Sequence, residues 1–60
     1  MKRWKLTKGK KTMFWTLYSQ NGLVWLESDR GDTLKVSNIE TAEEIIENQK
    51  GLGWSVSLSV

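Results

Sequence analysis

Cysteine and histidine are both absent from the 60 residues of this chain. Their absence excludes a disulfide, a Ser-His or Cys-His nucleophile and any zinc site built from these residue types. A carboxylate pair acting as acid and base would need a pocket that raises the pKa of one partner. We expect no such cavity, because one helix on one sheet leaves no room once three tryptophans fill the core. The sequence therefore predicts a protein that is not an enzyme and holds no cofactor and no metal.

Proline and long apolar segments are also absent. Without proline, no residue forces a break in a strand or helix. No segment reaches the roughly 18 apolar residues of a membrane span, and the basic N-terminus lacks the apolar stretch of a signal peptide. We therefore expect a cytoplasmic protein, in the host cytoplasm if a phage encodes it, with no membrane partner and no small-molecule substrate. The whole chain, 1–60, is expected to be one small domain.

Apolar and polar residues alternate with period two over most of the chain. This pattern predicts five β-strands, at 3–8, 12–19, 23–28, 32–37 and 53–60. Two-residue turns are expected at Gly9-Lys10 and, in type I′ geometry, at Asn21-Gly22. A three-residue loop at 29–31 would join the third and fourth strands. If the uncharged last strand lay outermost, it would be an edge able to pair with another chain.

The period changes near Thr41, where a helix is predicted. Four residues have the i, i+3, i+4, i+7 spacing of one helical face: Ala42, Ile45, Ile46 and Gln49. Thr41 and Glu44 would form a capping box at its start. Gly51 is expected to end the helix in left-handed geometry.

The three turns fix three hairpin registers, which pair Trp4 with Trp15, Leu17 with Leu26, and Leu26 with Leu34. All three registers place the same side chains on one face: Trp4, Leu6, Met13, Trp15, Leu17, Val24, Leu26, Leu34 and Val36. A slip of one residue would invert a whole strand, so this agreement supports the registers. The helix would cover this face and seal Trp4, Trp15 and Trp54 beneath it, and the last strand would add Val56 and Leu58.

The predicted fold class is therefore α+β: an antiparallel β-meander of four strands, one α-helix packed on one face, and a fifth C-terminal strand. The fifth strand would lie beside the first and antiparallel to it, which gives the strand order 5-1-2-3-4. One face of the sheet would stay uncovered.

Basic residues are concentrated at the start of the chain. Six of the nine fall in the first eleven positions, where no acid occurs, and positions 12–60 hold the other three with all seven acids. A compact domain with this segregation has a strong electrostatic polarity, which selects partners before shape does.

The uncovered face of the sheet carries the candidate binding residues. Three of these candidates are aromatic and three are positively charged: Arg3, Lys5, Phe14, Tyr18, Trp25 and Lys35. The outer side of the helix is acidic instead, with Glu40, Glu43, Glu44 and Glu47. We therefore expect a molecule that is positive on the sheet and negative on the helix.

Two binding functions fit this face, and a purely structural role fits it too. Trp, Tyr and Arg are enriched in protein-binding hot spots, which favours a protein partner. Aromatic rings interleaved with cations also hold single-stranded nucleic acid, through stacking worth about 1–3 kcal/mol per base. A cross-strand aromatic pair such as Tyr18 with Trp25 stabilises any sheet by roughly 0.2–1 kcal/mol without further function. A protein partner is the favoured interpretation, and nucleic acid is the alternative.

Over its first three strands the chain resembles the small YegP-like domain of unknown function. The resemblance lies in segments 3–6 and 14–22 and in Ala42 and Ile45 of the predicted helix. That family has two strands, an Asn-Gly turn, a third strand and an Ala-containing helix. This chain departs from it at 28–31, where Ser-Asp-Arg-Gly replaces the family's Ser-Glu-Gly-Tyr.

A second resemblance is to small phage proteins that inhibit host RNA polymerase. Its matching pieces are Lys10-Lys11, Phe14-Trp15, Glu40-Thr41 and the segment 53–56, Gly-Trp-Ser-Val. This resemblance implies a stand-alone binding protein that docks on a larger macromolecule and inhibits or modulates it. The chain is also similar to integrase arm-binding and plant AP2-type domains, which share three strands and a helix that opens with a Thr-initiated segment, as at 41–44. Those domains read DNA with the sheet, which keeps direct nucleic-acid binding as the alternative.

Overall fold

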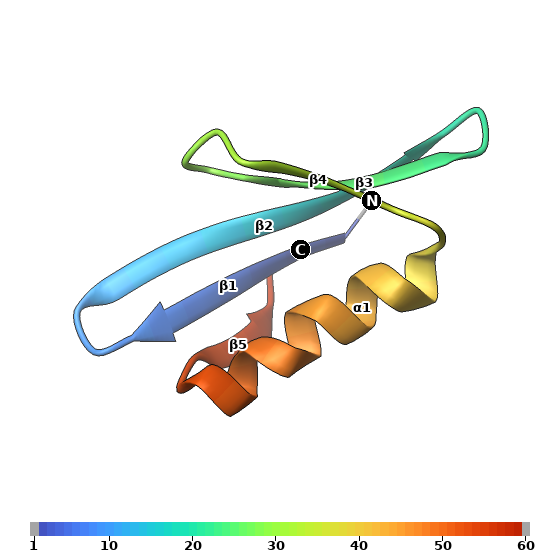
Figure 1. Cartoon of the computed structure of the whole chain (residues 1–60). Coiled ribbons are helices and arrows are strands. Elements are labelled where there is room, and N and C mark those ends of the chain that lie inside the picture. Colours follow the sequence, from blue (N-terminus) through green and yellow to red (C-terminus); the bar gives the residue numbers. More distant parts are fainter. Residues whose placement is uncertain (1, 60) are drawn as a thin grey trace.

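A computed structural model describes residues 2–59, which form one five-stranded sheet with helices on one side (Figure 1). The elements follow the chain in this order: β1 (Lys2–Lys8), β2 (Lys11–Gln20), β3 (Leu23–Ser28), β4 (Thr33–Val36), the α-helix α1 (Ile39–Asn48), the 3-10 helix η1 (Gln49–Leu52) and β5 (Ser55–Leu58). The strand order is β4-β3-β2-β1-β5, and all neighbouring strands are antiparallel. The predicted α+β class and the predicted strand order are confirmed.

The three hairpin registers are also confirmed. Trp4 lies opposite Trp15 in β1 and β2, and Leu26 of β3 lies opposite Leu17 on one side and Leu34 on the other. The β2–β3 turn has φ of 52° at Asn21 and 79° at Gly22. Positive φ at both central residues is the type I′ geometry, whose twist matches that of the strands it joins. The residues of the turn and the alternation of apolar and polar residues together therefore determine which side chains lie on each face of the sheet.

The predicted capping box at the helix start is wrong. The helix begins at Ile39, and Asn38 is its N-cap, because the Asn38 side chain accepts a hydrogen bond of 2.8 Å from the backbone N–H of Thr41. Asparagine is at least as good an N-cap as threonine. The earlier cap also lets the N–H of Ala42 bond to the Asn38 carbonyl at 3.3 Å, as the first helical turn requires.

The end of the helical segment lies two residues later than the sequence predicted. α1 continues into η1, and Gly51 lies within η1, so the prediction of left-handed geometry at Gly51 is wrong. Gly53 takes that role with φ of 94°. Its N–H bonds to the Lys50 carbonyl at 3.1 Å, and the Trp54 N–H bonds to the Gln49 carbonyl at 3.2 Å. These two bonds are those of a Schellman motif, which satisfies carbonyls at a helix end.

The core is small and lies between the sheet and α1. Its buried side chains are Trp4, Leu6, Leu17, Leu26, Ala42 and Ile46. Trp15 and Trp54 are only half-buried, so of the three tryptophans predicted to be sealed beneath the helix only Trp4 is buried. Leu34 and Leu58, both predicted to be core residues, are 42% and 58% exposed.

Geometry explains the exposure of these edge residues. A helix with its side chains is about 10 Å wide. Five strands spaced about 4.8 Å apart span roughly 19 Å. One helix therefore covers about half of the sheet, and Leu58 on the edge strand β5 remains 58% exposed. Leu34 lies on β4, at the other edge of the sheet.

Candidate binding face of the sheet

The sheet face opposite α1 is called the open face here. Strand pairing assigns to it these side chains: Arg3, Lys5, Thr7, Thr12, Phe14, Thr16, Tyr18, Gln20, Leu23, Trp25, Glu27, Thr33, Lys35, Ser55 and Ser57. Directly paired residues of antiparallel strands share a face. The six residues predicted from the sequence are therefore all on this one face, and no helix of residues 2–59 covers them (Figure 1).

Tyr18 and Trp25 form the first aromatic group of the open face. They are paired across β2 and β3, and their rings stack with centroids 5.5 Å apart and planes 16° apart. Lys35 of β4 pairs with Trp25 on its other side. The Trp25 indole Nε1 donates a hydrogen bond of 2.8 Å to Oε2 of Glu27. The stack and this hydrogen bond together fix the orientation of the indole.

Phe14 and Arg3 form the second group. The Arg3 guanidinium carbon lies 4.4 Å from the centroid of the Phe14 ring, which is a cation–π arrangement. Lys5 pairs with Phe14 across β1 and β2. On the other side of β2, Asp29 accepts from the Phe14 N–H at 3.2 Å, and its own N–H donates to the Phe14 carbonyl at 3.1 Å. Both hydrogen bonds lie on the side of β2 away from β1, and together they hold the backbone under Phe14 in place.

Glu27 separates the two aromatic groups. It pairs with Thr33 of β4 and with Thr16 of β2, and Thr16 in turn pairs with Arg3 of β1. Its bond to the Trp25 indole was missed by the sequence analysis, although residues two apart on a strand lie on the same face. The open face thus carries three cations, Arg3, Lys5 and Lys35, around a central carboxylate.

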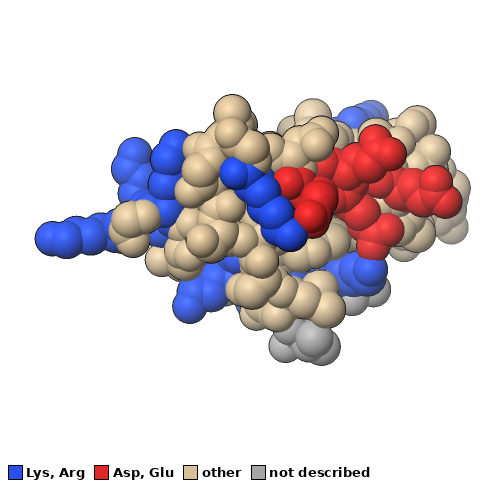
Figure 2. Space-filling model, turned by 90° about the horizontal axis from the view of Figure 1, so that it is seen from below, with Lys and Arg blue, Asp and Glu red and all other residues tan. Residues whose placement is uncertain are grey.

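The charge separation follows the length of the molecule more than the two faces. Lys2 and Lys8 lie on the helix side of β1, where Lys2 forms an ion pair with Glu43 of α1. Lys8 Nζ donates to the Leu52 carbonyl at 2.8 Å and lies 5.8 Å from the centroid of the Trp54 ring. Figure 2 shows basic side chains at the end of the β1–β2 turn and acidic ones over the helix. The expectation of a positive sheet and a negative helix is therefore too simple.

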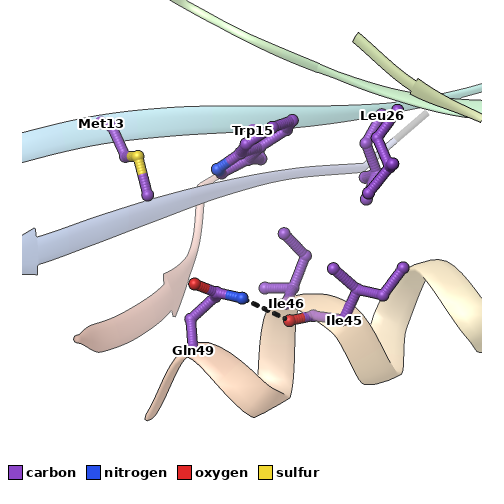
Figure 3. A pocket seen from close by; sticks show the side chains of 7 residues that line it. Met13, Trp15, Leu26, Ile45, Ile46 and Gln49 are labelled. Carbon is purple, nitrogen blue, oxygen red and sulfur yellow. Dashed lines mark hydrogen bonds between the residues drawn. The ribbon is translucent and has the colours of Figure 1, made fainter. Parts of the chain in front are cut away.

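An apolar cavity of about 160 Å³ lies between α1 and the sheet (Figure 3). Its lining is Met13, Trp15, Leu26, Leu34, Ile45, Ile46 and Gln49. The expectation that three tryptophans fill the core is wrong, because Trp15 and Trp54 are only half-buried and Trp15 lines this space. Gln49 uses its Nε2 to donate to the Ile45 carbonyl at 3.1 Å. No titratable side chain lines this cavity.

The outer side of α1 carries the four glutamates of the predicted acidic surface. Glu43 is paired with Lys2, and Glu47 with Lys50 at 2.7 Å. Among residues 2–59, no group of three acidic side chains has a geometry that could hold a metal ion. Neither helix in this part of the chain has the length and apolarity needed to cross a bilayer.

Comparisons with family models, with curated proteins and with solved structures found no match to this chain. The resemblances to YegP-like domains and to phage inhibitors of RNA polymerase therefore stay predictions.

Proposed function

We propose that this chain is a non-enzymatic binding protein that docks on a larger protein through its open face and inhibits or modulates it. The observation that carries the proposal is an uncovered sheet face on which three aromatic rings and three cations are grouped. Tryptophan, tyrosine and arginine dominate the energetics of protein interfaces. The open face carries all three residue types, with Tyr18 stacked on Trp25 and Arg3 over the ring of Phe14.

The aromatic groups are held in place before any partner binds. The Tyr18–Trp25 stack, the bond from Trp25 to Glu27 and the Arg3–Phe14 contact each restrict side-chain rotamers. Ordering a flexible side chain at an interface costs about 0.5–1.5 kcal/mol. Side chains that are already ordered avoid most of that cost, so this surface is suited to docking.

Charge favours a protein over a nucleic acid as the partner. Glu27 lies between the two aromatic groups, where a backbone of phosphates would pass, and its carboxylate would repel them. Tyr18 and Trp25 also cover one ring face of each other, which leaves less surface for stacked bases. A protein surface with carboxylates spaced to meet Arg3, Lys5 and Lys35 would complement this face.

Capture from a lysate of the source cells tests the proposal with three baits: wild type, Trp25→Ala and Glu44→Gln. Trp25→Ala removes the indole of the open face, whereas Glu44→Gln changes one exposed charge on the outer side of α1. We expect a protein that is retained by wild type and Glu44→Gln, and reduced at least tenfold with Trp25→Ala. Equal recovery with all three baits, or no specific recovery, would contradict docking through the open face.

Nucleic-acid binding is distinguished by a titration with single- and double-stranded oligonucleotides at low salt. Direct binding through the open face predicts quenching of tryptophan fluorescence, an affinity that falls steeply with salt, and loss of both in Lys5→Glu. Our proposal predicts a flat titration, and a captured protein that stays bound after nuclease treatment. Salt-sensitive quenching that Lys5→Glu abolishes would replace the protein partner with a nucleic acid.

A further inference from the structure

β5 forms an open edge of the sheet. It pairs with β1 on one side, and within residues 2–59 no strand lies on its other side. Positions 53–59 contain no charged residue and no proline. Natural proteins usually protect an edge strand with charge, proline or a bulge, because its free backbone groups can pair with another chain. At the opposite edge, β4 carries Lys35 and follows a loop with three charged residues, so it has the protection that β5 lacks.

The outward backbone groups of β5 can be assigned from its pairing with β1. The Ser59 N–H bonds to the Arg3 carbonyl at 2.6 Å, so the backbone groups of Ser59 point toward β1. Inward and outward backbone groups alternate along a strand. Ser57 and Ser55 therefore also face β1, and the N–H and C=O groups of Val56 and Leu58 point away from the sheet.

The side chains of β5 alternate with the same period. Residues 55–59 read Ser-Val-Ser-Leu-Ser, so the pattern of polar and apolar side chains is unchanged when the strand is reversed. Val56 and Leu58 lie on the helix side of the sheet, paired with Leu6 and Trp4. Leu58 is 58% exposed there, although its neighbour Trp4 is buried. An apolar side chain from a strand added beside β5 could therefore pack against Leu58 and extend the apolar surface on the helix side of the sheet.

We propose that β5 pairs with β5 of a second copy of this chain, antiparallel and with the two Ser57 residues opposite each other. In this register Val56 of each copy lies opposite Leu58 of the other, where the outward backbone groups can exchange four hydrogen bonds. Apolar side chains then meet on the helix side, and serines meet on the open face. The result is a two-fold symmetric dimer with one continuous ten-stranded sheet.

The reversible pattern argues for a second copy as the occupant. A two-fold interface needs a surface that is complementary to itself. β5 meets this condition in backbone hydrogen bonding, in side-chain pattern and in charge, because an uncharged strand does not repel its own copy. The interface is short, and interfaces that bury less than about 1,200 Å² are weak. We therefore expect a dimer that forms reversibly as the protein concentration rises.

Sedimentation equilibrium between about 10 µM and 1 mM tests for this dimer, since weak interfaces have dissociation constants in that range. Wild type should shift from the monomer mass toward twice that mass. Leu58→Lys places a charge on the edge at an exposed position, and it should stay monomeric over the same range. A monomer at every wild-type concentration, or an unchanged dimer in Leu58→Lys, would overturn the proposal.

Single cysteines test the register, because the chain has none of its own. Two thiols introduced by Ser57→Cys would lie at a non-hydrogen-bonded pair, with Cα atoms about 4.5 Å apart, within the range for a disulfide. Those from Ser55→Cys would lie four residues apart along the ladder, about 14 Å, which is too far. In a glutathione redox buffer we expect Ser57→Cys to form at least tenfold more covalent dimer than Ser55→Cys. Equal cross-linking of the two variants would refute the register.

Amide hydrogen exchange provides a readout that does not depend on substitution. With rising concentration, the amides of Val56 and Leu58 should become protected, whereas those of Ser57 and Ser59 should be protected throughout. Concentration-independent exchange at Val56 and Leu58 would overturn the pairing. The dimer and the proposed docking function can be refuted independently of each other. Leu58→Lys should still capture the partner protein, and Trp25→Ala should still form the dimer.

Discussion

Filling the cavity beneath α1 should raise the stability of the protein. Leu34 of β4 lines this cavity of about 160 Å³ and is 42% exposed, so a larger side chain can grow into the cavity without displacing a buried neighbour. Leu34→Phe adds roughly the volume of one methylene, and burial of a methylene contributes about 0.8 kcal/mol. Phenylalanine also has a high preference for strands. Since Leu34 stays partly exposed, we expect a gain of about 0.5–1 kcal/mol in the free energy of unfolding.

Thermal unfolding followed by circular dichroism measures this gain. For a domain of this size, 1 kcal/mol corresponds to about 4–8 °C in Tm, so Leu34→Phe should raise the Tm by about 2–8 °C. Leu23→Phe is the matched control, because Leu23 is exposed on a strand but does not line the cavity. The reasoning is refuted if Leu34→Phe unfolds at or below the wild-type temperature. It is also refuted if the control gains as much, since strand preference alone would then explain the effect.

Three further predictions concern local structure, and each is measured by chemical or thermal unfolding. Asn38→Ala removes the N-cap of α1 and should cost about 1 kcal/mol; no loss would mean that the cap is dispensable. Gly53→Ala should cost about 1 kcal/mol or more, because φ at Gly53 is 94°, whereas Gly51→Ala should be neutral or stabilising. A larger loss of stability in Gly51→Ala than in Gly53→Ala would contradict the helix end described above. A double-mutant cycle on Tyr18 and Trp25 should give a coupling energy of about 0.5–1.5 kcal/mol, and additive losses would show that the stack contributes nothing.

Sequence reasoning succeeded where two independent local signals had to agree. The turn at Asn21-Gly22 sets one register, and the alternation of β2 and β3 sets the same one. A register error of one residue would have moved Leu26 from the core side to the open face and Trp25 to the core side, at a large cost in buried apolar surface. The six candidate binding residues were placed on one face for the same reason, since a strand with a fixed register has fixed faces.

The helix ends were predicted less well because each end offers two candidates of equal quality. Asn38 and Thr41 are both good N-caps three residues apart, and Gly51 and Gly53 are two residues apart at the other end. Local preference does not separate such pairs. The choice depends on where α1 must lie to bury Ala42 and Ile46 against the sheet, which is a property of the folded molecule.

The alternation of apolar and polar residues could not predict how far the side chains at the sheet edges are buried, and it could not predict the cavity. Alternation indicates which face a side chain occupies, but not whether a helix covers that part of the face. Leu58 and Trp4 share a face and are direct neighbours, yet one is exposed and the other buried. Leu58 lies on the edge strand β5 and Trp4 on the inner strand β1, and alternation does not indicate which strand lies at an edge.

The single helix also separates the surfaces of the molecule. Because α1 is narrower than the sheet, Leu58 on the edge strand β5 stays exposed, and because α1 lies on one side only, the rings of Tyr18 and Trp25 stay on the open face. Leu58 and Trp25 lie on opposite faces, with two strands between β5 and β3. Substitutions at sites this far apart with no shared partner usually act additively. A double variant of Leu58→Lys and Trp25→Ala should therefore lose self-pairing and partner capture independently, and any coupling between the two losses would indicate that both sites belong to a single interface.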